Sequence, residues 1–476
     1  MQPLNRQTAQ ISVQRPVKVI QFGEGNFLRG FVDWMIDILN EKTDFNGAVE
    51  IIQPLDKGIY KLINDQDGLY HVVLEGIQDG QTTQETRLIS CVQNAMSPYA
   101  DYAGYLKLAE NPDLQFIISN TTEAGISFDA ADASPETTPS SFPGKLTALL
   151  YRRFQHFKGA SNKALTIIPC ELIEKNGEAL RTTILQFAQH WNLPEAFSNW
   201  IEADTIFCNT LVDRIVPGFP KDTIQDIQQE IGFEDTLVVK AEPFHLWVIE
   251  APESVQAAFP TDKAGLQVKF ADDLTPYRTR KVRILNGAHT ALVPVAYLQG
   301  LRTVREAVED ETSGTFIKEA IYEEIIPTLD LTAEELNQFA KDVLERFQNP
   351  FIHHELITIA LNSVAKYKVR VLPSVLEYKQ RKGALPQRLL RSLAALILFY
   401  KGEYNGQQIP LNDTPEVLEF FQAAWQKDSV EETVKMALAN EDFWGQDLNQ
   451  IDGLTALVTA EAVALQQAEN VQASAN

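Results

Sequence analysis

Cysteine is scarce in this chain, and its few cysteines form no spaced pair. The 476 residues include three, Cys91, Cys170 and Cys208, with no Cys-x-x-Cys that would indicate a zinc site or a redox dithiol. An odd, widely spaced set does not build a disulfide framework. We therefore expect a protein of a reducing compartment, the cytoplasm.

Basic residues are in the minority, and long apolar runs are missing. The 41 Lys and Arg stand against 64 Asp and Glu, for a net charge of -23, which repels nucleic-acid backbones and anionic membranes. The amino-terminal segment has no apolar signal core, and the apolar run at 393–400 is too short to span a bilayer. Neither nucleic acid nor membrane is expected as a partner, and the sequence does not indicate an oligomeric state.

The first half has the pattern of an α/β domain. Residues 17–22 form an apolar run ending in Gly-Glu-Gly, apolar residues then recur with helical spacing from Phe27 to Ile38, and a β-branched run follows at 48–52. This pattern predicts a strand, glycine turn, helix and parallel strand. Further buried strands are expected at 114–119 and 164–169, and a β-hairpin around Asp79-Gly80. Residues 129–144, rich in small and turn-forming residues, are predicted to form a surface loop or a flap over a cofactor.

The second half has the spacing of helices and few β-rich runs. Helical spacing is found at 295–308, 315–326, 333–347, 385–400 and 415–426. The predicted fold class is α/β plus α: an N-terminal Rossmann-like, doubly wound sheet domain with the inserted hairpin over 1–275, and a predominantly helical C-terminal domain over 276–476.

The glycine turn is a candidate cofactor site. Gly23, Gly25 and Gly30 occupy the place, after a strand and before a helix, where a dinucleotide needs close backbone approach and a helix amino terminus. Their spacing is not Gly-x-Gly-x-x-Gly, so an ordinary strand-to-helix turn is the alternative. At the end of the second strand, Gln53 can hydrogen-bond a ribose hydroxyl, and no arginine follows to receive the extra phosphate of NADP, which favours NAD.

A second motif is Lys281-Val-Arg-Ile-Leu-Asn286-Gly-Ala-His289. On a helix, Asn286 and His289 share one face and Lys281 lies about a turn and a half earlier. Reduction of a ketone needs a proton donor for the oxygen and neutral donors for the developing alkoxide, and burial lowers the pKa of an ammonium group into a useful range. The alternative is a pair of solvated cations and a core histidine.

Both motifs resemble those of the polyol-specific long-chain dehydrogenases, the mannitol dehydrogenase family. The segments KVIQFGEGNFLRGFVDW, SNTTEAGI, IIPCELIEKNG, LVDRIVPGFP, EPFHLWVIE and KVRILNGAHTALVPV occur in the order found in that family. The match extends through nearly the whole chain and is nearest to the members that reduce the keto-uronate tagaturonate to altronate with NAD. The resemblance therefore implies a metal-independent, NAD-dependent oxidoreductase of hexuronate catabolism with a small keto-uronate substrate.

The resemblance also implies roles for individual residues. Lys281 resembles the catalytic acid-base lysine, and Asn286 and His289 resemble donors to the substrate oxygen. Glu123 is similar to a glutamate near the cofactor and the lysine, Asp213 to an active-site aspartate, and Lys366 to a substrate-binding lysine. The cofactor-binding stretch corresponds to Val19, Ile20, Gln21, Phe22, Gly23, Glu24, Gly25, Asn26, Phe27, Leu28, Arg29 and Gly30.

Two departures from the family argue against a neutral polyol. Mannitol dehydrogenases carry Cys-Asp-Asn where this chain has Cys170-Glu-Leu, and an arginine where it has Thr358. A uronate needs a cation for its carboxylate, which Lys366, Lys368 and Arg370 offer, although a solvated helix face explains them equally well.

Several functions stay open from the sequence. Fructuronate differs from tagaturonate at one carbinol, a polyol dehydrogenase is the next alternative, and a non-catalytic NAD-binding sensor belongs to another class. The pair His353-His354 lacks a second, suitably spaced ligand pair, so no metal is expected.

Overall fold

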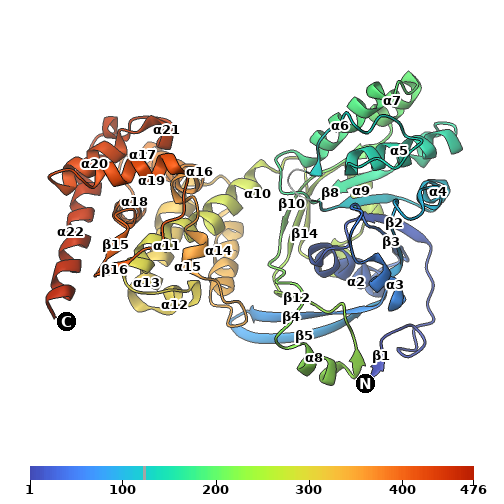
Figure 1. The fold of residues 1–476 in the computed structure, drawn as a ribbon, viewed down its shortest axis with the longest axis horizontal. Helices are drawn as coiled ribbons and strands as arrows, with labels where there is room; N and C mark the ends of the chain where they lie inside the picture. Colours follow the sequence, from blue (N-terminus) through green and yellow to red (C-terminus); the bar gives the residue numbers. More distant parts are fainter. Residues whose placement is uncertain (122–124, 476) are drawn as a thin grey trace. The chain divides into compact units, whose positions relative to one another are not determined.

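The computed structural model describes residues 1–121 and 125–475. Its contacts divide the chain into two compact units, Met1–Glu75 with Thr82–Leu274, and Gly76–Gln81 with Thr275–Asn476. Figure 1 draws the first mainly in blue to green and the second mainly in yellow to red. In the described residues, no helix is both long and apolar enough to serve as a membrane span.

The first unit is built on a six-stranded sheet. Its spatial order is β6-β3-β2-β7-β8-β9, and each neighbouring pair is parallel. Numbered along the sheet's own strands, this is 3-2-1-4-5-6, the doubly wound order that binds dinucleotides at its switch point. The expected strand and turn pattern is therefore confirmed. The strands are β2 Val17–Phe22, β3 Ala48–Ile52, β6 Val92–Met96, β7 Phe116–Ser119, β8 Thr166–Pro169 and β9 Ile206–Phe207.

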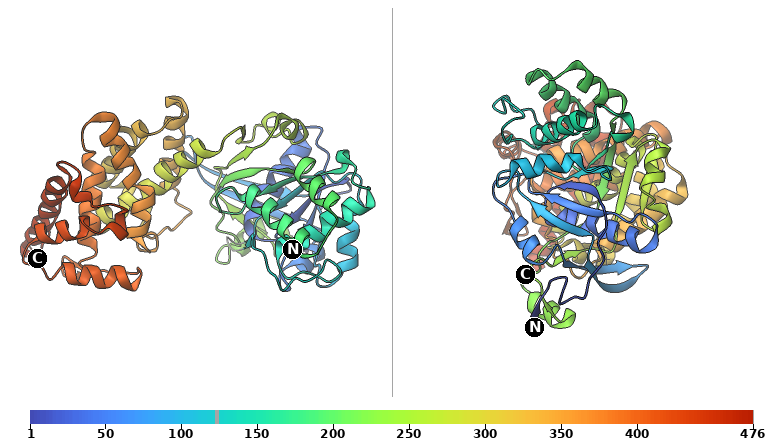
Figure 2. Two further views of the ribbon diagram at one scale, coloured as in Figure 1. Left: turned by 90° about the horizontal axis from the view of Figure 1, so that it is seen from above. Right: turned by 90° about the vertical axis from the view of Figure 1, so that its right-hand side faces the viewer.

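Alternate strand residues enter two separate hydrophobic cores. Val19 and Ile51 pack in the core that includes residues of α2 (Trp34–Lys42). Their neighbours Ile20 and Ile52 pack instead with residues of α5 (Phe142–His156), α6 (Asn176–His190) and α7 (Glu195–Ala203). Because successive strand side chains point to opposite faces, a sheet covered on both faces needs an almost continuous apolar run. Figure 2 shows α5, α6 and α7 together on one side of this unit.

The predicted hairpin is present, but it belongs to another sheet. Strands β4 (Tyr70–Gln78) and β5 (Gln81–Ile89) flank Asp79 and Gly80, whose φ angles are 52° and 74°. Two positive φ values give the turn that matches strand twist. Strand β4 pairs with β12 (Val239–Ala241), not with the six-stranded sheet. A third sheet contains β10 (Asn209–Asp213), β13 (Leu246–Glu250) and β14 (Val268–Ala271), which the sequence pattern did not indicate.

The second unit is predominantly helical, as expected, with one break that the sequence prediction missed. The helix predicted over 295–308 is two helices, α11 (Gly287–Leu298) and α12 (Val304–Glu309). Gly300 has a φ of 91°, and Thr303 and Glu306 form a capping box that starts α12. Other helices include α13 Glu311–Glu319, α14 Ala333–Phe347, α16 Ser363–Arg370, α17 Leu372–Lys382, α18 Gln387–Phe399, α19 Pro415–Ala424, α20 Val430–Leu438 and α22 Leu454–Ala475.

Candidate functional site

A cavity of about 530 Å³ lies at the carboxyl ends of the central strands of the first unit. Its walls come from the segments that follow β2, β3 and β7, together with the start of α5. This is the place at which doubly wound sheets hold their ligands. The lining residues are Gly23, Glu24, Gly25, Pro54, Leu55, Asn120, Thr121, Gly125, Ser127, Asp129, Ser140, Ser141 and Phe142.

The glycines at 23, 25 and 30 differ in backbone conformation and in how closely other atoms approach them. Gly23 has a φ of 120°, and a Cβ there would lie 3.0 Å from the Asn120 carbonyl oxygen. Gly30 lies against β12, where a Cβ would approach Val239 Cγ1 to 3.0 Å. Gly25 has ordinary extended dihedrals, and nothing within 4 Å would meet its Cβ. The backbone conformation therefore favours glycine at 23 and close side-chain packing favours it at 30, whereas Gly25 leaves open space beside the cavity.

Several side chains of the predicted cofactor-binding stretch, 19–30, are buried in the fold. Val19, Ile20, Phe22 and Leu28 are buried in the cores, so their side chains support the turn and do not face a ligand. Gly23, Glu24 and Gly25 line the cavity. The structure therefore narrows the cavity-lining part of this stretch to the turn itself.

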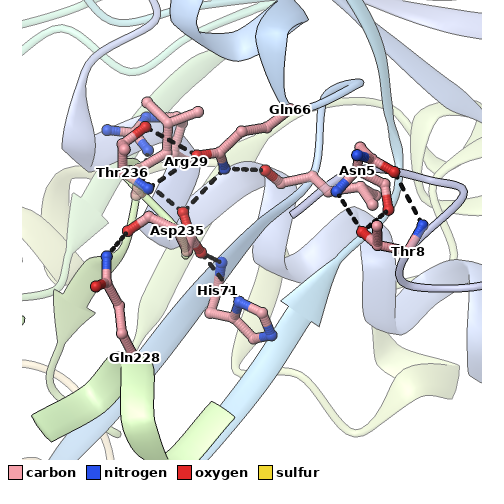
Figure 3. Close-up of polar contacts among 10 residues, drawn as sticks. Asn5, Thr8, Arg29, Gln66, His71, Gln228, Asp235 and Thr236 are labelled. Atoms are coloured by element: carbon pink, nitrogen blue, oxygen red, sulfur yellow. Dashed lines mark hydrogen bonds and ion pairs between the residues drawn. The ribbon is translucent and has the colours of Figure 1, made fainter. Parts of the chain in front are cut away.

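Arg29 is buried and holds the backbone of the glycine turn by hydrogen bonds. It is 3% exposed, and its guanidinium donates to the carbonyls of Glu24 (3.0 Å) and Leu237 (2.6 Å). Next to Leu237, Asp235 accepts hydrogen bonds from Gln66 and His71, a network that Figure 3 draws beside Arg29. Because buried charges must be hydrogen-bonded, the two carbonyl acceptors hold the guanidinium in place, and Arg29 in turn holds the Glu24 backbone.

Gln53 is also held by the protein itself. It is 1% exposed, and its amide nitrogen donates to the carbonyls of Leu55 (2.8 Å) and Asp56 (3.1 Å). Its Oε1 accepts from the Tyr60 backbone nitrogen at 3.3 Å. Gln53 therefore shapes the loop after β3, and its contact with a ribose stays a prediction.

The loop before α5 is anchored by an aspartate and a lysine. Asp132 accepts hydrogen bonds from the backbone nitrogens of Ser140 (2.5 Å) and Ser141 (3.0 Å). Burial raises the pKa of Asp132, but the hydrogen bonds from Ser141 and Ser140 outweigh it and hold this pKa below its ordinary value. Lys145 donates to the Ser140 carbonyl at 2.7 Å and to Tyr99 Oη at 3.0 Å, and burial lowers the pKa of Lys145 to about 8. The loop ends at Ser141, which caps α5, so the predicted boundary at Gly144 is wrong by about one helical turn.

The ends of β7 and β8 are tied together by Glu171. This carboxylate follows β8 and accepts from Ser119 Oγ (3.0 Å), the Thr121 backbone nitrogen (2.9 Å) and Thr121 Oγ1 (3.0 Å). Burial raises the pKa of Glu171, and these hydrogen bonds oppose the rise. Asn120 Nδ2 donates to the Cys170 carbonyl at 2.7 Å. The predicted Glu123 lies outside the described residues.

Several cavity residues were missed from the sequence, although a signal for them exists. Asn120 and Thr121 follow a buried strand directly, and polar residues at the carboxyl end of a parallel strand face the switch point. Ser140 and Ser141 belong to the predicted loop or flap at 129–144, but no pattern singles them out within it, because Asp132 and Lys145 hold the loop that brings them to the cavity.

In the second unit, Lys281 and Asn286 lie at the two ends of a π-helical turn, Lys281–Asn286. The Gly287 nitrogen donates to the Val282 carbonyl, a bond across five residues. In an α-helix a spacing of five places two residues about 140° apart around the axis, whereas the wider turn brings Asn286 closer to the face of Lys281. The π turn therefore changes the expected position of Lys281 relative to Asn286, while His289 lies in the α-helix that follows. Single π turns are frequent at functional sites.

Gly287 allows α16 to pack on this turn. A Cβ at Gly287 would lie 2.9 Å from the Arg370 carbonyl oxygen, and α16 packs against α11 and the π turn. Lys366 and Arg370, four residues apart on α16, are half-buried. Burial and the nearby Arg370 lower the pKa of Lys366, whose Nζ donates to the Ile359 carbonyl at 2.8 Å. The structure therefore brings the helix of Lys366 against the helix of the Lys281 motif.

His289 has aromatic neighbours. Its ring stacks on Phe347 with centroids 4.0 Å apart and meets the edge of His354 at 5.2 Å. Burial lowers the pKa of His354. The neighbouring His353 lies 3.7 Å from a Glu355 oxygen, and among the described residues no group of three or more His, Cys, Asp or Glu is arranged for a metal.

Asp213 and the three cysteines are the remaining residues singled out from the sequence. Asp213 ends β10 and is buried, and it is not among the described residues that line the 530 Å³ cavity. Cys91, Cys170 and Cys208 are all buried and free. Asp213 therefore keeps its predicted role in substrate binding only as a prediction.

The strand order and the glycine turn at its switch point define a dinucleotide-binding Rossmann unit followed by a helical unit. Two family models match: the mannitol dehydrogenase Rossmann domain over residues 17–263 and the mannitol dehydrogenase C-terminal domain over residues 273–466. The chain belongs to the mannitol dehydrogenase family.

Its relatives and structural neighbours agree with that assignment. The altronate oxidoreductase of Phocaeicola vulgatus is 49% identical over 98% of both chains, and that of Bacillus subtilis is 49% identical over 96% of this chain and 94% of its own. A substrate-free D-sorbitol dehydrogenase shares the fold with a TM-score of 0.80 at 22% identity, covering 99% of both chains. Pseudomonas fluorescens mannitol 2-dehydrogenase, solved with NAD and D-mannitol, has a TM-score of 0.68 at 22% identity, with coverage of 99% and 98%.

Proposed function

We propose that this protein is an NAD-dependent oxidoreductase that interconverts tagaturonate and altronate in hexuronate catabolism in the cytoplasm. The observation that carries the proposal is near 50% identity, over almost the full length of both partners, to relatives named altronate oxidoreductase. Fructuronate, a neutral ketose and a non-catalytic NAD sensor are the alternatives that an assay must separate.

The Rossmann unit fits a dinucleotide. The open space at Gly25, which is exposed just before the following helix, suits a pyrophosphate group. Leu55, which is largely exposed, lines the same cavity after β3, the side on which this strand order receives the adenosine half. Asn120, Thr121 and Ser141 add polar groups on the other side. When bound, NADH supplies the hydride that reduces the keto carbon.

The helical unit supplies the proton. Lys281 protonates the oxygen of the keto group as that carbon is reduced, and it accepts the proton in the reverse direction. Asn286, which a π turn places nearer the Lys281 face than an α-helix would, and His289 are proposed to donate hydrogen bonds to the same oxygen and stabilise its developing negative charge. Phe347 holds the imidazole of His289 in a fixed plane by stacking.

A uronate also needs a cation for its carboxylate. Lys366 and Arg370 are half-buried cations one helical turn apart on α16, and their burial makes a charge-assisted hydrogen bond stronger than at an exposed site. Because a neutral ketose has no carboxylate, this pair favours a keto-uronate.

The first experiment is a spectrophotometric NADH assay on the purified full-length protein. Tagaturonate, fructuronate and fructose are compared at equal concentration, and we expect kcat/KM to be highest for tagaturonate. A preference for fructuronate or fructose would assign that compound as the substrate instead, and NADH binding without reduction of any of the three would indicate a sensor.

Replacement of Lys281 by Ala tests the proton donor. We expect kcat to fall by about 100- to 10,000-fold, the range for a general acid or base, while the Kd for NADH stays within about twofold because the cofactor binds the other unit. Lys382→Ala, at an exposed lysine that ends α17, is the matched control and should keep full activity. A parallel loss of NADH affinity and turnover in Lys281→Ala would argue for a structural role.

A further inference from the structure

A second cavity of the first unit, about 800 Å³, lies at the opposite edge of the six-stranded sheet. Its lining includes the second residue of β2, Lys18, and the first residues of β7 and β8, Phe116 and Thr166. The sheet is parallel, so these positions mark the amino ends of the strands, whereas the cofactor cavity lies at their carboxyl ends. The two cavities are therefore separate sites.

Lysines gather on this second cavity. Four of its lining residues are lysines, Lys18, Lys42, Lys163 and Lys263, against a single acid, Asp44. The chain as a whole has the reverse balance, 41 basic to 64 acidic residues. Among the residues that the structure describes, none of the four lysines has a carboxylate oxygen within 4.0 Å. Four cations that lack a carboxylate partner on one concave surface repel one another, and a bound anion would relieve that repulsion.

Two of these lysines are held in place by the backbone. Lys18 Nζ donates to the Phe45 carbonyl at 2.5 Å, and Lys163 Nζ donates to the Pro112 carbonyl at 3.1 Å. Lys42 and Lys263 are exposed and make no such contact among the described residues. Each ammonium group has three donors, so even the two anchored lysines keep donors for a ligand.

Helix ends do not explain the whole cluster. Lys42 lies in the last turn of α2, where a cation complements the helix dipole. Lys18 lies in a strand, and Lys163 and Lys263 lie in short 3-10 turns. The dipole of a full α-helix therefore accounts for the charge of Lys42 alone, whereas Lys18 and Lys163 also lie over the rings of Phe45 and Phe157.

We propose that this cavity binds a small molecule with two phosphate groups, such as a sugar bisphosphate or a pyrophosphate. Its volume is in the range of metabolite sites, and four point charges match at least two phosphates, for which lysine is a common ligand. Gln115 and Asn162 add exposed amide side chains that can donate to the oxygens of such a ligand. A single uronate carboxylate would leave most of the cations without a partner.

Isothermal titration on the full-length protein tests this site. The probes are inorganic pyrophosphate and glucose 1,6-bisphosphate, added to protein saturated with NADH so that the cofactor cavity does not compete for phosphate. We expect saturable binding of one molecule per chain, with an affinity that falls as salt is raised. The variant Lys42→Glu/Lys263→Glu changes only exposed side chains, so it should fold normally and bind at least about tenfold more weakly.

The control has the same change in net charge away from the cavity. Lys221→Glu/Lys427→Glu reverses two exposed lysines that do not line it, and it should bind both probes within about twofold of the parent protein. Absence of saturable binding of both probes, or an equal loss in the two double variants, would overturn the proposal. Because no substrate or turnover enters the measurement, the result is independent of the proposed reaction.

Discussion

Replacement of Gly25 by Ala separates the needs of the fold from those of the cofactor. Gly25 has φ -67° and ψ 166°, which any residue adopts, and apart from Gly25 and its two chain neighbours no residue has a heavy atom within 4 Å of the position that a Cβ would take. The folded protein thus has no steric reason for this glycine. We expect Gly25→Ala to leave the free energy of unfolding unchanged or to raise it by about 0.4–1 kcal/mol, because alanine restricts the unfolded chain.

Cofactor binding should respond in the opposite direction. The methyl group would occupy the space in which the backbone approaches a pyrophosphate. Overpacking of that kind costs about 1–3 kcal/mol, which corresponds to an NADH dissociation constant roughly 5- to 150-fold higher. Fluorescence titration with NADH measures the affinity, and urea unfolding without cofactor measures the stability.

The matched comparison is Gly23→Ala, two residues earlier. Gly23 has a φ of 120°, and its Cβ would lie 3.0 Å from a backbone oxygen, so this variant should unfold at clearly lower urea concentration. The reasoning is refuted if Gly25→Ala loses stability as Gly23→Ala does, or if it binds NADH as tightly as the parent protein.

Two further predictions concern buried groups. Gly287→Ala places a methyl group 2.9 Å from the Arg370 carbonyl, so α16 must shift; we expect kcat to fall by about 10- to 100-fold with NADH affinity unchanged, and full activity would contradict the packing argument. Burial raises the pKa of Asp33 and of Glu50 to about 7 each, so the folded protein binds protons that the unfolded chain releases between about pH 4 and 7, and stability falls as pH rises through that window. Asp33→Asn should reduce this slope, by on the order of a few kcal/mol across the window, in urea unfolding measured at several pH values; an unchanged slope would show that Asp33 does not titrate there.

Local patterns accounted for much of the fold. Strands β2 and β3 and helix α14 begin and end where the apolar pattern predicted. A strand buried on both faces needs a continuous apolar run, and a helix buried on one face needs apolar residues at helical spacing, so the sequence shows both directly. The hairpin turn at Asp79-Gly80 followed from residues that tolerate positive φ. The break at Gly300 was missed, since a glycine inside an apolar helical pattern is a weak signal.

The sequence by itself determined the doubly wound domain, the helical domain, the glycine turn and the Lys281 motif, because each depends on neighbours within a few residues or on the resemblance of whole segments. Only the tertiary structure decided which polar groups face a ligand. Gln53 and Arg29 are held by backbone carbonyls, Ser140 and Ser141 are brought to the cofactor cavity by Asp132 and Lys145, and four lysines from distant segments meet at the other edge of the sheet. The Arg29 bond and the lysine cluster join segments far apart in the chain. The bonds of Gln53, Asp132 and Lys145 span only two to eight residues, but they lie in irregular loops, whose side-chain contacts no apolar spacing encodes.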